Sequence, residues 1–262
     1  MVASEFRLEA RKKLDGKWGK VACFTLAYIA ILFVLVFISG VFPESMQFIL
    51  SLIISIIEVP LSFGFKIAFL KLYNDEEVKA FDFLSLGFTN FKKSWEVSFH
   101  MFLKILVPII LIILSYVFIG FGMFGMLGSS LYGSSSTTGS FGILSIIGFI
   151  LLIVSMIWGI TKSYYYQLSY LVAADNLEMS SKEAVLKSEE LMTNKRGKLF
   201  CLQFSFIGWI FLTCFTLGIG YLWLFPYVQF ALIAFYKFAT GNSSNVKAEV
   251  VTDNSNDPIQ GK

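Results

Sequence analysis

Residues 21–41 read VACFTLAYIAILFVLVFISGV, a stretch without a charged side chain. An α-helix rises about 1.5 Å per residue, so about 20 such residues cross the roughly 30 Å hydrocarbon core of a bilayer. A strand of a membrane barrel would be about half this long and would alternate apolar with polar side chains. The stretch therefore predicts a transmembrane helix, in which every backbone group is satisfied internally.

Five more stretches are long and mostly apolar, although Glu58 and Lys66 interrupt the first of them. They are residues 46–72, 97–119, 141–160, 199–217 and 219–240. Apolar residues make up 56% of the chain and charged residues only 15%, against about 25% charged in a soluble domain. The predicted fold class is an all-α polytopic membrane bundle with six transmembrane helices and short cytoplasmic amphipathic helices.

The predicted domains follow from these boundaries. Residues 1–20 form a cytoplasmic amphipathic helix, residues 21–240 the six-span domain, and residues 241–262 a polar, disordered cytoplasmic tail. Within the second region, the Gly- and Ser-rich residues 128–140 predict a flexible loop.

Cations are distributed on one side of the predicted bundle. The 21 Lys and Arg residues fall before the first span, around the second and fourth connections, and at the end of the chain. The positive-inside rule assigns that side to the cytoplasm. We expect a multi-pass protein of the cell membrane with both termini cytoplasmic.

Each cationic segment follows a short amphipathic pattern. The patterns lie at residues 4–14, 80–91 and 180–192, the last opening with a capping box of Ser180 and Glu183. We call the segments that follow the first elbow (14–20, LDGKWGK), the second elbow (88–95, FTNFKKSW) and the third elbow (192–200, MTNKRGKLF). The order predicts three repeats of short helix, elbow and hairpin. The alternative is that these cations only set topology.

The sequence contains few of the residues and motifs that enzymes use for catalysis. A single histidine excludes multi-His metal sites, and no G-x-x-x-x-G-K-[ST] motif is present to bind phosphates. We expect no enzymatic activity, no cofactor and no metal. Nucleic acid is not an expected partner, because the net charge is only +3.

Glu58 is the one acidic residue deep inside a predicted span. A charge at mid-membrane costs about 2.5–3.5 kcal/mol, so such residues are neutral, paired or line water. One hypothesis is that Glu58 carries a proton or binds a cation. The other is structural: Glu58 bonds the Ile56 carbonyl that Pro60 leaves without a donor.

The most specific stretch is EAVLKSEELMTNKRGKLF, followed by FIGW, GIG and WLFPY. This stretch resembles the bacterial integral membrane family called domain of unknown function 975. The matching positions are Ala184, Ser188, Leu191, Met192, Asn194, Lys195, Phe206, Ile207, Gly208, Trp209, Gly218, Ile219, Gly220, Trp223, Pro226 and Tyr227. The resemblance implies a six-span membrane protein without an assigned activity.

Two functions remain open on sequence grounds. The first is a non-enzymatic accessory or scaffold protein with a basic cytoplasmic face that contacts membrane lipid or another membrane or cytoplasmic protein. The candidate contacts are Lys92, Lys93, Lys195, Arg196 and Lys198. The second is a small-solute or proton-coupled transporter that uses Glu58. The oligomeric state stays open, because no G-x-x-x-G motif is present.

Overall fold

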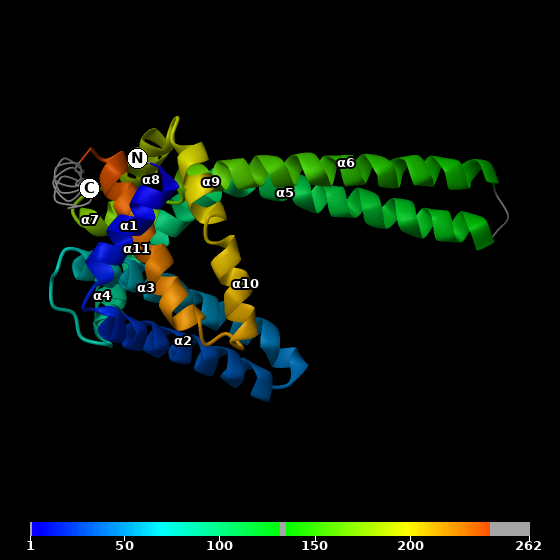
Figure 1. Cartoon of the computed structure of the whole chain (residues 1–262). Helices are drawn as coiled ribbons and strands as arrows, with labels where there is room; N and C mark the ends of the chain where they lie inside the picture. Colours follow the sequence, from blue (N-terminus) through cyan, green and yellow to red (C-terminus); the bar gives the residue numbers. More distant parts are fainter. Residues whose placement is uncertain (1, 132–134, 242–262) are drawn as a thin grey trace. The chain divides into compact units, whose positions relative to one another are not determined.

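A computed structural model describes residues 2–131 and 135–241 (Figure 1). All regular secondary structure in these residues is helical. The helices are α1 (Ala3–Leu14), α2 (Trp18–Val41), α3 (Glu44–Tyr73), α4 (Asp82–Thr89), α5 (Phe91–Leu131), α6 (Ser135–Tyr166), α7 (Ser169–Asp175), α8 (Ser181–Met192), α9 (Arg196–Phe204), α10 (Ile207–Phe215) and α11 (Tyr221–Ala239). The predicted tail lies outside the described residues, apart from Gly241.

Six helical segments of the described chain are long and apolar enough to cross a membrane. They are Trp18–Val41, Glu44–Tyr73, Phe91–Leu131, Gly139–Asp175, Arg196–Phe215 and Tyr221–Ala239. The all-α fold class with six spans is therefore confirmed. The fifth segment bends between α9 and α10, where the Phe206 amide donates to the Gln203 carbonyl in a tighter i to i+3 turn.

The chain forms two compact units. One comprises Met1–Val97 and Leu168–Lys262, and the other comprises Ser98–Gln167. The second unit is a hairpin of α5 and α6, which are 41 and 32 residues long. Both helices extend well past the predicted spans 97–119 and 141–160. The predicted loop at residues 128–140 is helical on both sides of residues 132–134, which lie outside the described chain.

Small residues line the contact within the α5–α6 hairpin. A Cβ atom added to Gly122 would lie 2.3 Å from the Ser145 hydroxyl, and one added to Gly148 would lie 2.8 Å from an Ile119 side-chain carbon. Ser115 and Ser155 are fully buried in the same hairpin. In lipid, small residues of this kind let two helices approach closely, so these glycines serve packing within the chain.

In the first unit, prolines divide the lipid-exposed from the enclosed parts of two helices. Every buried residue of α3 lies at or after Pro60, and the exposed large apolar side chains of α3 all precede it. In α11, burial is nearly continuous from Pro226 onward. Pro removes an amide donor from the helix that contains it, so in both helices the change in burial lies at the proline.

Three short helices enclose the buried parts of the spans. α1 packs on α11, α4 on α3, and α8 on α7. The buried residues of each short helix include two that are four positions apart and therefore lie on the same helical face. The pairs are Phe6 and Ala10, Phe83 and Gly87, and Ala184 and Ser188. We call α1, α4, α7 and α8, together with residues 60–73 and 226–239, the short-helix layer.

Aromatic rings fill the core of this layer. The Phe24 ring of α2 lies 5.2 Å from Phe83 of α4 and 5.5 Å from Phe69 of α3. Phe69 in turn lies 5.8 Å from Phe230 of α11. These edge arrangements are favourable for aromatic pairs, so the layer and the start of α2 share a packed aromatic core.

α3 and α4 approach so closely that their contact requires glycine. A Cβ atom at Gly87 would lie 2.2 Å from the Pro60 carbonyl oxygen, and one at Gly64 would lie 2.1 Å from the Phe83 carbonyl oxygen. Both obstacles are backbone atoms, which cannot move aside as a flexible side chain can.

Candidate functional site

The first and third elbows share one backbone conformation. Each begins with a four-residue turn, at 14–17 and 192–195, whose last amide donates to its first carbonyl at 2.9 and 3.1 Å. The third residue of each turn is left-handed, with φ of +70° at Gly16 and +62° at Asn194. Gly and Asn are the residue types that tolerate this conformation. The similarity supports the predicted repeat.

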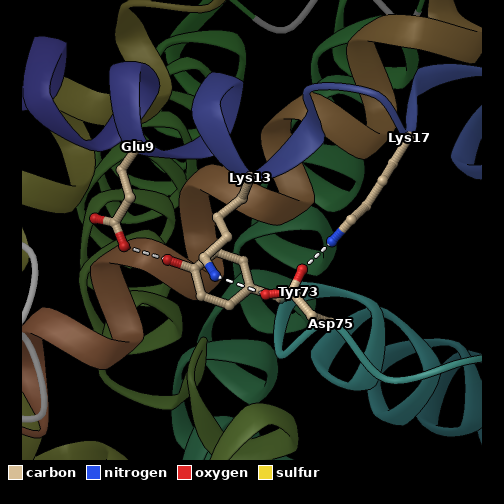
Figure 2. Close-up of polar contacts among 5 residues, drawn as sticks. All are labelled: Glu9, Lys13, Lys17, Tyr73 and Asp75. Atoms are coloured by element: carbon tan, nitrogen blue, oxygen red, sulfur yellow. Dashed lines mark hydrogen bonds and ion pairs between the residues drawn. The ribbon is translucent and has the colours of Figure 1, made fainter.

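At the first elbow, Lys17 and the preceding Lys13 of α1 bind Asp75, just after the end of α3 (Figure 2). Lys13 and Lys17 both donate to the carboxylate of Asp75, Lys13 at 3.0 Å. The hydrogen bonds from Lys17 and then Lys13 lower the pKa of Asp75 below its ordinary value. Beside them, the Tyr73 hydroxyl donates to the Glu9 carboxylate of α1.

In the second elbow, Lys93 binds the segment that follows α7. Its ammonium group donates to three backbone carbonyls, at 3.0 Å to Asn176, 2.6 Å to Leu177 and 3.0 Å to Met179. The Asn176 side chain accepts from the Met179 amide at 3.1 Å and holds the same turn. Lys93 thus binds the turn that follows the C-terminus of α7.

In the third elbow, Lys195 binds the end of α11. Its ammonium donates to the carbonyl of Ala239, the last residue of that helix, at 2.9 Å. A cation at a helix C-terminus also interacts favourably with the helix dipole.

The three elbows share one arrangement. Each elbow precedes a hairpin of two spans, and a lysine at the elbow binds at or just after the C-terminal end of the second span of that hairpin. We call these contacts the lysine clamps; they comprise Lys13 and Lys17, Lys93, and Lys195. Each hairpin is thereby closed into a loop at the short-helix layer.

The model of the family described as "Protein of unknown function (DUF975)" matches residues 1–243. The chain belongs to the DUF975 family. The match contains all six spans and all three clamps. No curated protein and no solved structure matches the chain.

The resemblance to DUF975 can now be explained in physical terms at the third elbow. Ala184 and Ser188 are the buried pair of α8, and Met192 is fully buried at its end. Asn194 supplies the left-handed turn residue, and Lys195 forms the clamp. These motif positions therefore build the junction between short helix and span.

The candidate contact residues have different surroundings in this DUF975 chain. Lys93 and Lys195 are engaged within the chain, as described above. The Lys92 side chain is 92% exposed, with the Glu96 carboxylate 3.9 Å from its ammonium. Lys198 lies 5.0 Å above the Phe238 ring, and Arg196 is half-buried at the start of α9.

Glu58 lies on the exposed side of α3. Among the residues described, it forms no hydrogen bond and no ion pair. The Ile56 carbonyl instead accepts from the Trp95 indole N–H at 3.4 Å. The structural hypothesis predicted that Glu58 would bond the Ile56 carbonyl. Trp95 of the second elbow forms this hydrogen bond instead.

Lys66 is a polar residue of α3 whose partner the sequence did not indicate. Its ammonium donates to the Gln229 side-chain oxygen of α11 at 2.5 Å. Glu58, Ser62 and Lys66 are spaced four apart and so share one helical face. From this spacing, the sequence could have predicted a polar stripe that leads from Glu58 to the contact with α11.

Proposed function

We propose that this DUF975 protein is a non-enzymatic accessory protein of the cell membrane whose short-helix layer faces the cytoplasm and contacts the headgroups of anionic lipids. The observation that carries the proposal is the set of lysine clamps. They join the elbows that follow the three short helices to the ends of the spans, so that the layer is held beside the spans.

The cations that remain outside the clamps supply the attraction. Lys12, Lys20, Lys79, Lys92 and Lys182 are exposed in the layer or next to it. Each cation near an anionic leaflet contributes about 1 kcal/mol of binding. The cytoplasmic orientation rests on the positive-inside rule applied to these residues and to the clamps.

Lipid analysis of the purified protein tests this function. Extraction from native membranes in mild detergent is expected to retain anionic lipid at a higher fraction than the bulk membrane contains. Replacing Lys12, Lys92 and Lys182 with Gln is expected to reduce that enrichment. Bound lipid with the bulk composition, together with a protein retained in stoichiometric amount, would instead favour a role as scaffold for a partner protein.

Transport through Glu58 is the second candidate, and the stripe of Glu58, Ser62 and Lys66 favours it. An unpaired carboxylate within a span is a functional feature by default. A count of about 1.5 Å per residue from Glu44 puts Glu58 about 21 Å into α3, past the midpoint of a 30 Å core. Uptake into proteoliposomes that is lost in Glu58→Gln and retained in Ser55→Ala would establish this role.

A further inference from the structure

A cavity rich in tryptophan lies between the start of α2 and helices α10 and α11. Its volume is about 240 Å³, and its walls include Trp18, Trp209, Trp223 and Tyr227. Three of the five tryptophans of the chain are therefore in one place. Thr213 lies in the wall, and Arg11 of α1 completes it.

A second cavity adjoins the first at Arg11 and Tyr227. Its volume is about 160 Å³, and it adds Arg7 and Ser4 to those two residues. Tyr227 stands between the two cavities: its hydroxyl donates to the Arg7 carbonyl at 3.3 Å, and the Arg11 guanidinium lies 5.8 Å above its ring. The two cavities thus lie next to each other and share Arg11 and Tyr227 in their walls. Together we call them the Trp–Arg groove.

Among residues 2–131 and 135–241, neither Arg7 nor Arg11 forms an ion pair with a carboxylate. The Nε atom of Arg7 is buried and has no hydrogen-bond partner among these residues. A buried donor without a partner is costly, so an acceptor from outside the chain is expected at this position.

We propose that the Trp–Arg groove binds one molecule of an anionic phospholipid. Arg7 and Arg11 are one helical turn apart and can donate together to one phosphate group, for which guanidinium has the matching fork geometry. The tryptophan-lined cavity receives part of an acyl chain. Along α11 it runs from Tyr227 to Gly220, about 10 Å at 1.5 Å per residue.

The surroundings favour a lipid over a soluble anion. Trp209, Trp223, Phe211 and Leu212 near the groove are exposed apolar side chains on spans, where the solvent is the lipid itself. The larger cavity is below the roughly 300–1,000 Å³ of a site for a drug-sized molecule, but it suits a section of a chain. The position of α1 beside an anionic leaflet rests on the proposed function.

Fluorescence of the wild-type chain gives the first test. The purified protein in detergent is titrated with phosphatidylglycerol or phosphatidylcholine that carries bromine on the acyl chain, which quenches nearby tryptophan. We expect quenching by brominated phosphatidylglycerol to saturate at one lipid per chain, at about one-tenth of the concentration that phosphatidylcholine needs. Equal quenching by the two lipids would overturn the proposal.

Variants locate the site. Arg7→Gln together with Arg11→Gln is expected to weaken phosphatidylglycerol binding about tenfold or more, to the level of phosphatidylcholine. Lys187→Gln is the matched control: this exposed lysine is paired with Glu190 and lies outside the groove, so its replacement should leave phosphatidylglycerol binding unchanged. Replacing Trp18, Trp209 and Trp223 with Phe removes the three tryptophans of the groove and is expected to remove most of the quenchable signal. Quenching that survives this change would place the lipid at Trp95 or Trp158 and overturn the proposal.

Two further arms separate the outcomes. Inorganic phosphate is not expected to displace the brominated lipid; displacement at millimolar phosphate would show a site for a free anion. The variant with Gln in place of Lys12, Lys92 and Lys182 tests the proposed function separately. If this variant loses the general enrichment of anionic lipid but still binds one brominated phosphatidylglycerol, the groove and the exposed lysines act separately. If the arginine variant does not fold, the wild-type comparison of the two lipids still decides.

Discussion

The indole N–H of Trp95 donates to the carbonyl of Ile56 at 3.4 Å. Ile56 is the residue whose carbonyl loses its helical donor, because Pro60 lies four positions later in α3. The second elbow therefore supplies a donor to a carbonyl of a different helix. In lipid, water cannot serve as a substitute donor, so this hydrogen bond contributes more to stability than it would at a surface exposed to water.

We expect Trp95→Phe to lower the free energy of unfolding by about 1–3 kcal/mol, the cost of an unsatisfied polar group. In a Pro60→Ala background, the new amide can serve the Ile56 carbonyl, so the same change should cost less. A double-mutant cycle on reversible unfolding in detergent measures the coupling. A cost that is equal in both backgrounds would mean that Trp95 stabilises the fold only by packing.

The contact between α3 and α4 should fail when Gly87 acquires a side chain. Gly87→Ala would place its Cβ atom 2.2 Å from the Pro60 carbonyl oxygen, and overpacking of this kind costs about 1–3 kcal/mol or more. Gly19→Ala is the matched control, since nothing lies within 4 Å of its added Cβ. Melting temperatures of the two variants that fall by the same amount would contradict the close approach.

The clamp of the second elbow can be tested against its neighbour in the chain. Lys93→Met removes three hydrogen bonds to carbonyls and should destabilise the protein by about 1–3 kcal/mol. Lys92→Met changes a side chain that is 92% exposed and should cost less than about 0.5 kcal/mol. Similar unfolding curves for the two variants would refute the clamp.

Asp75 gives the first clamp a pH dependence. Its pKa is lower in the folded chain than the ordinary 3.8, because Lys17 and Lys13 hydrogen-bond to its ionised form. The ionised Asp75 therefore contributes fully to the free energy of unfolding at pH values above its pKa in the unfolded chain. This contribution is lost as the pH falls through its lower pKa in the folded chain. The contribution is below about 1 kcal/mol, because the pair is exposed. Between pH 6 and 3, the melting temperature of wild type should approach that of Asp75→Asn; a constant gap would contradict this contact.

Sequence reasoning predicted the helical spans well, because unbroken apolar runs such as residues 21–41 depend only on local composition. It also predicted three short helices and their elbows. The predicted helix lengths were too short where apolar and small residues continue beyond the span. For example, α5 runs to Leu131, although its predicted span ended at residue 119.

The partners of the charged residues could not be predicted. Lys93 meets carbonyls more than 80 positions away, and Lys195 meets Ala239, 44 positions on. A cation in an elbow has the same sequence signature whether it faces lipid or clamps a helix. Only the folded chain separates Lys93, which is held by backbone carbonyls, from Lys92, which faces outward.

The central claim is that the three short helices lie together on the cytoplasmic side, joined to the spans by the lysine clamps. Labelling of single cysteines with a membrane-impermeant maleimide tests it most directly, in a background where Cys23, Cys201 and Cys214, all exposed, are replaced by Ser. We predict that Lys12→Cys, Lys92→Cys and Lys182→Cys are labelled in inverted vesicles but not in intact cells, and that Phe42→Cys and Ile219→Cys show the reverse. Labelling of any short-helix position in intact cells would contradict the claim.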